Sequence, residues 1–183
     1  MKIRYLVLAM IGAMALSLGA VACSSDDGDG NGGGELTLAE YFSALEPLSQ
    51  GYADDLDTLD EEAGEEFEGS ESEDDGIEIF INFVDDMGSA TDDFVGDLDG
   101  VNAPAEAAAA HDEAVIAGQE MVEMYDNALT VLDTAETFEE ATLILEGPGF
   151  VAAADRFAAS CAGLQGVAAD NGIVIDMDCP DTD

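Results

Sequence analysis

Apolar side chains recur at alternating spacings of three and four residues through most of this chain, and this pattern constrains the fold more than any other feature of the sequence. Such spacings place side chains on one face of an α-helix. The pattern is unbroken in the stretch Ala108, His111, Val115, Gly118, Val122, Tyr125, Leu129 and Leu132. We therefore predict an all-α, antiparallel four-helix-bundle-like domain with arms of about 20–30 residues.

The first expected helix has a clear start and one internal irregularity. Its apolar stripe covers residues 38–67. Thr37 and Glu40 fit a capping box, in which each side chain binds the backbone amide of the other residue. Pro47 lies inside the stripe and should kink or split the helix, because proline has no amide proton to donate.

Glycine and proline separate the later helices. A second stripe covers residues 77–98, where the alternation at 77–81 also admits a short strand. Pro104 suits the first turn of the next helix. Thr137 fits the cap of a short helix, and the Gly-Pro-Gly sequence at 147–149 ends it. The fourth arm of the bundle is therefore expected to be broken.

The charge of the chain is strongly one-sided. All 43 acidic residues follow residue 22, where Arg156 is the only Lys or Arg. Binding of nucleic acid through its phosphates is therefore excluded, and adsorption to an anionic membrane is disfavoured. Three explanations of the acidity remain open: a solvated, self-repelling surface, adaptation to high salt, or binding of cations or of a basic partner. Apolar packing must hold the fold, because few salt bridges can form.

The first 22 residues have the pattern of a secretory signal peptide. Lys2 and Arg4 precede a nearly unbroken apolar run, and small residues lead to Cys23. The segment resembles the lipobox of bacterial lipoproteins, although Ala20 stands where the usual pattern prefers Leu. The resemblance implies that Cys23 carries lipid and becomes the new amino terminus. A plain cleaved signal and an uncleaved anchor are the alternatives, the apolar run being at the short end of the ~17–25 residues that span a membrane.

Residues 23–35 are expected to form a flexible acidic tether. Asp, Gly and Ser dominate the segment, which cannot bury enough apolar surface to offset the entropy of ordering it. The folded domain should therefore begin at residue 36 and extend to residue 183.

Cys161 and Cys179 are expected to form a disulfide. Cys161 lies on the apolar stripe of the last expected helix, which should end at Asn171-Gly172. Cys179 lies in the tail beyond that end, and the extended tail is long enough to reach back. In an oxidising compartment the pair should bridge and pin the tail across the bundle.

The sequence favours neither a metal site nor a cofactor. His111 is the only histidine, and Ala108 occupies the position where a di-iron bundle would need Glu. A hydrogen-bonded histidine in the core or at its boundary is the preferred interpretation. Residues 27–32 match the first half of a calcium loop, but Leu38 stands where the loop needs Glu. A dense acidic cluster at residues 61–75 could gather divalent ions loosely, although such a run is usually a solvated face.

No catalytic residue is predicted. The sequence contains no nucleophile elbow, phosphate loop, dinucleotide fingerprint or zinc-protease motif. Carboxylate pairs carry no specificity in a chain with so many acidic residues. An enzyme is therefore not expected.

Three further stretches resemble small, acidic, helical lipoproteins of environmental, Chloroflexi-like bacteria, which have no assigned function. They are residues 36–41, Pro104-Ala105-Glu106 followed by His111, and residues 161–165 followed by Gly172-Ile173 and Cys179. The resemblance implies secretion and the disulfide, but no active site.

The expected function is that of a lipid-anchored extracytoplasmic module of the cell envelope, which binds or scaffolds another envelope protein. The alternative is capture of a cation such as calcium, or of a small ligand, at the cell surface. A pocket near Gly118 and His111 would favour the small-ligand alternative. An exposed apolar patch would favour a protein partner.

Overall fold

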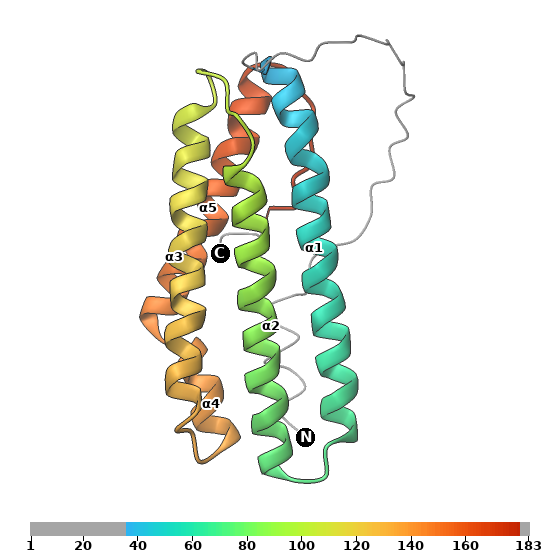
Figure 1. The fold of residues 1–183 in the computed structure, drawn as a ribbon, viewed down its shortest axis with the longest axis vertical. Helices are drawn as coiled ribbons and strands as arrows, with labels where there is room; N and C mark the ends of the chain where they lie inside the picture. The colour runs from blue at the N-terminus through green and yellow to red at the C-terminus, as the bar shows by residue number, and fades with distance from the viewer. Residues whose placement is uncertain (1–35, 180–183) are drawn as a thin grey trace. The chain divides into compact units, whose positions relative to one another are not determined.

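The structure, a computed structural model, describes residues 36–179, all within one unit of the chain, Gly34–Asp183. The predicted all-α fold is confirmed, since the described residues form helices and no strand. The helices are α1 Leu38–Gly69, α2 Glu73–Asp99, α3 Ala108–Leu132, α4 Phe138–Leu145 and α5 Pro148–Asp170. α1, α2 and α3 alternate in direction, and α5 returns antiparallel to α3 after the short α4 (Figure 1).

α1 begins at the predicted capping box and continues through its proline. The Thr37 side chain accepts from the Glu40 amide, and the Glu40 carboxylate accepts from the Thr37 amide at 2.9 Å. Pro47 was expected to kink or split the helix, and the split does not occur, because α1 is continuous across it. Pro47 and Ser43, whose carbonyl loses its helical partner, are both exposed, so water can satisfy that carbonyl. The buried side chains on the opposite face hold the helix together.

α2 and α3 begin in different ways. The Ser72 side chain caps α2 by accepting from the Asp75 amide, and residues 77–81 are helical, so the alternative of a strand there is wrong. α3 begins at Ala108 without a side-chain cap. Pro104 therefore lies before the helix and not in its first turn, and its carbonyl accepts from the amides of Ala107 and Ala108.

The fourth arm is broken as predicted. Thr137 caps α4 by accepting from the Glu140 amide. Gly147 caps α5, and Pro148 occupies its first turn, where the missing amide costs nothing. α5 ends at the predicted place, where Gly172 adopts a φ of +71°, which favours glycine.

Two apolar clusters form the interior of the bundle. One lies near the start of α1 and the end of α5, and it contains Tyr41, Phe42, Leu45, Val95, Leu98, Ala107, Ala114, Val115, Leu164, Ala168 and Met177. The other lies where α4 covers α2 and α3, and it contains Phe80, Val84, Met121, Tyr125, Ala128, Leu132 and Ala141. No α1 side chain is fully buried in the second cluster, where only Phe67 of α1 packs against its edge.

Candidate functional site

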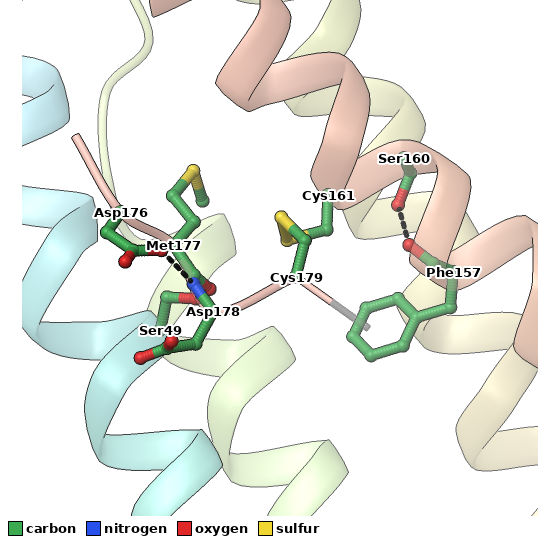
Figure 2. Close-up of a disulfide and its surroundings, with 8 residues drawn as sticks. All are labelled: Ser49, Phe157, Ser160, Cys161, Asp176, Met177, Asp178 and Cys179. Carbon is green, nitrogen blue, oxygen red and sulfur yellow. Dashed lines mark hydrogen bonds between the residues drawn. A yellow bond between two sulfur atoms is a disulfide. The ribbon is translucent and has the colours of Figure 1, made fainter. Parts of the chain in front are cut away.

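The Cys161–Cys179 disulfide is confirmed and fixes the C-terminal tail to α5. The two sulfur atoms lie 2.01 Å apart and the Cα atoms 5.6 Å apart. Figure 2 shows the tail passing between α5 and α1, with the disulfide on one side and Ser49 on the other. The tail therefore closes the seam between the first and last helices of the bundle.

The seam is sealed by the tail residue Met177, which is 2% exposed. The Ser49 hydroxyl donates to the Met177 carbonyl, and the Asp178 amide donates to an Asp176 carboxylate oxygen at 3.2 Å (Figure 2). This role of Ser49 was not predicted from the sequence. The available signal was its position four residues after Leu45, on the same buried face.

Asp178 lies in a crowded electrostatic environment beside α1. Burial raises the pKa of its carboxyl, as do the neighbouring charges of Asp176, Asp54 and Asp57. Its φ of 46° is in the left-handed region, which aspartate tolerates better than most residues. The tail is thus held against an acidic segment of α1 by packing, one hydroxyl and the disulfide, and not by charge.

His111 is a core histidine, as preferred from the sequence. It is 6% exposed, and its Nδ1 atom shares a hydrogen bond of 2.9 Å with the hydroxyl of Tyr41, which is fully buried. Burial lowers the pKa of His111, while Asp112 and Asp99 act in the opposite direction. Burial also raises the pKa of Tyr41. The pair joins α1 to α3 as two neutral groups.

The space near Gly118 is filled by side chains. A Cβ built on Gly118 would overlap Val95 and lie 3.3 Å from Phe157. The rings of Tyr52 and Phe94 stack with centroids 4.7 Å apart, and Phe157 meets both edge-on. The helices are therefore in contact near Gly118, where the small-ligand alternative predicts a pocket.

Arg156 clamps α5 to α3. Its guanidinium lies 2.9 Å from a carboxylate oxygen of Glu113 and also pairs with Glu120. The two glutamates are seven residues apart, so both lie on one face of α3. These partners raise the pKa of Arg156. The only Lys or Arg of the described residues is therefore already engaged.

Two open clefts lie along α2. The α1–α2 cleft has a volume of about 250 Å³ and is lined by Leu59, Glu62, Ala63, Glu66, Ile79, Asn82, Phe83, Asp85 and Asp86. The α2–α3 cleft has a volume of about 270 Å³ and is lined by Asp85, Gly88, Ser89, Asp92, Val122, Tyr125, Asp126 and Leu129. The sequence could not locate either cleft, because both depend on how neighbouring helices pack.

Several residues singled out in the sequence are not brought together into a site. Cys23, the tether and the partial calcium loop at residues 27–32 lie outside the described residues. The acidic cluster at 61–75 is divided between the end of α1 and the start of α2. Within residues 36–179, no three His, Cys, Asp or Glu side chains converge as a metal site would require.

Large exposed apolar residues are distributed over several elements. They are Ile116, Val131, Leu143, Val151 and Val174. Ile116 and Val131 are about 22 Å apart along α3, so these two do not form one patch. None of the described helices is long and apolar enough to cross a membrane.

Comparisons with protein-family models, with curated proteins and with solved structures found no match to this chain. Any function must therefore be inferred from the residues of this chain alone.

Proposed function

We propose that this chain is a lipid-anchored protein outside the cytoplasmic membrane, where its helical domain binds or scaffolds another envelope protein. The observation that carries the proposal is the Cys161–Cys179 disulfide. Disulfides form and persist in oxidising compartments and are rare in the cytosol. The signal-like residues 1–22 and the cysteine that follows them support the same location.

The packing of the interior supports a function carried out at the surface. Gly118 is in contact with neighbouring side chains, and the buried His111 is already bonded to Tyr41. In the described part of the chain, every buried side-chain nitrogen and oxygen has a hydrogen-bond partner. A bound substrate usually needs a cavity with polar groups left to receive it. These features favour a binding module over an enzyme.

The anchoring is tested by labelling cells that express the full chain with an alkyne fatty acid. Wild type and the matched control Ser24→Ala should incorporate the label, whereas Cys23→Ala should not. The labelled proteins should also be retained in the membrane fraction. Equal labelling of Cys23→Ala and wild type, or absence of label from wild type, would contradict lipidation at Cys23.

Capture of calcium is the second candidate, because carboxylates line both clefts of α2, although no three of them converge within the described residues. Its test is a thermal melt of the metal-stripped full chain in calcium chloride and in sodium chloride of matched ionic strength. Saturable stabilisation by calcium alone would support a specific site, because only binding to the folded state raises stability in this way. Equal stabilisation by both salts would show screening of the acidic surface and would exclude this candidate.

A further inference from the structure

We infer that the α1–α2 cleft is a docking groove for a basic amphipathic helix of a partner protein. This inference rests on the proposed binding role and assigns it to one surface. The groove runs between the second half of α1 and the first half of α2, which lie side by side (Figure 1).

The less exposed residues that line the cleft are apolar, and we call them its floor. Leu59 and Ala63 come from α1, and Ile79 and Phe83 from α2, and all four side chains remain partly exposed. Each pair is spaced by four residues, so each helix contributes a row of two apolar side chains along the groove. A helix that docks in a groove presents its own apolar residues at spacings of three and four. The length of the floor matches one or two turns of such a partner helix.

The rim of the cleft is acidic on both sides. Glu62 and Glu66 are exposed on α1, and Asp85 and Asp86 are exposed on α2. Lys or Arg residues flanking the apolar anchors of a partner helix would meet carboxylates on either side. Charge complementarity of this kind selects partners and accelerates their encounter.

The same charges argue against a second copy as the occupant. Arg156 is the only Lys or Arg after residue 22, and it is paired with Glu113 and Glu120 on another face. Another copy of the domain would therefore bring acidic residues to an acidic rim. The occupant must supply the positive charge that this chain lacks.

The position of the cleft along α1 also supports docking of a partner helix there. No side chain of α1 after Ser49 is fully buried, whereas the start of the helix is covered by the core and by Met177 of the tail. The second half of α1 rests on α2 and leaves the row of Leu59 and Ala63 partly exposed. A partner helix would cover this half as the tail covers the other.

The test uses the absence of tryptophan from the chain. Phe83→Trp places one fluorophore in the α1–α2 cleft of the full chain, and Val122→Trp places one in the α2–α3 cleft as a control. The probe is a synthetic helical peptide of Leu and Lys, and its negative control is the same peptide with Glu in place of Lys. We expect a saturable blue shift of the emission of the Phe83→Trp variant with the Lys peptide only. The emission of the Val122→Trp variant should not shift with either peptide.

Two double variants separate this groove from general charge attraction. Glu62→Gln with Glu66→Gln removes two carboxylates from the rim, and Asp92→Asn with Asp126→Asn removes two from the other cleft. At physiological ionic strength, the first should raise the Kd about fivefold and the second less than about twofold. Circular dichroism spectra and melting temperatures verify that both variants fold.

Three outcomes would overturn the assignment of the groove. They are equal weakening of binding by the two double variants, equal emission shifts of the two fluorophores, and no saturable binding of the Lys peptide. The fatty-acid labelling of Cys23 is independent of this cleft. If the peptide fails to bind the cleft but the wild-type chain is still labelled, only the groove is rejected. If the wild-type chain is not labelled, the proposed anchoring is rejected.

Discussion

The two halves of α1 belong to one continuous helix but are stabilised differently. The first half buries Tyr41, Phe42, Leu45 and Ser49, and the tail seals it through Met177. The second half, from Gly51 to Gly69, buries no side chain completely and leaves an open cleft beside α2.

The difference shows that amphipathic spacing alone does not determine how well a helix is covered. Both halves carry apolar residues at helical spacing. Only the first half has fully buried side chains and a hydrogen bond to the disulfide-pinned tail. Beyond α2, the second half meets other elements only through partly buried rings, Tyr52 against Phe157 of α5 and Phe67 against Phe138 of α4. The second half should therefore open locally at a lower free energy than the first.

The largest expected effect comes from truncating one aromatic ring in each half of α1. Phe42→Ala should lower the free energy of unfolding by about 3–5 kcal/mol, because the ring is fully buried. Phe67→Ala should cost about half as much, because that ring is only partly buried. Urea denaturation measures both losses. Equal losses would show that the two halves of α1 are equally well packed.

Removal of the disulfide should have the next largest effect. Cys161→Ser or Cys179→Ser opens a loop with a sequence separation of 18 and should cost on the order of 3 kcal/mol. Hydrogen exchange should accelerate first at residues 38–49 of α1, and residues 51–69 should change little. A uniform acceleration along α1 would contradict the idea that the tail stabilises one half selectively.

The buried Tyr41–His111 pair should make the first half sensitive to acid. Burial lowers the pKa of His111 in the folded state, so the unfolded chain takes up the proton first as the pH falls below about 6.5. The contribution of His111 to the free energy of unfolding should therefore be complete at neutral pH. It should decline as the pH falls toward the pKa of His111 in the folded state. Urea denaturation at several pH values measures the decline, and His111→Gln should remove its contribution. If the free energy of unfolding of the His111→Gln variant falls with pH as steeply as that of the wild type, the pH dependence comes from carboxylates.

The smallest effect should come from the Arg156 clamp, which joins α3 and α5 and touches neither half of α1. Its side chain is 38% exposed and those of Glu113 and Glu120 are 50% and 45% exposed, so water and salt screen the pairs. Arg156→Gln should lower the free energy of unfolding only slightly, and the loss should shrink at high salt. Arg156→Lys, which keeps the charge, is the matched control. A salt-independent loss would indicate that the side chain acts through packing.

Much of the fold was predictable because its signals are local. The caps at Thr37 and Thr137, the stop at Gly172 and the stripe of α3 depend on residues within a few positions of one another. The disulfide was predictable because the lengths of α5 and of the tail limit where Cys179 can reach. The split expected at Pro47 does not occur, because the cost of a proline inside a helix depends on which face it occupies, and that face is exposed.

The candidate sites were less predictable because they depend on contacts between distant parts of the chain. The bond of Tyr41 to His111 joins residues separated by 70 positions, and that of Ser49 to Met177 joins residues separated by 128. The floor of the α1–α2 cleft depends on the rotation of two helices about their axes. No spacing within one helix specifies that rotation.

The presence of a single Lys or Arg in residues 36–179 has a practical consequence for proteolysis and labelling. Trypsin cleaves only after Lys or Arg, so Arg156 on α5 is its single target in the folded domain. Both cysteines of the disulfide follow that position, and a cut there would leave the two fragments joined by packing alone. Amine-directed crosslinkers have no lysine to react with in the domain, whereas carbodiimides can activate carboxylates on every helix.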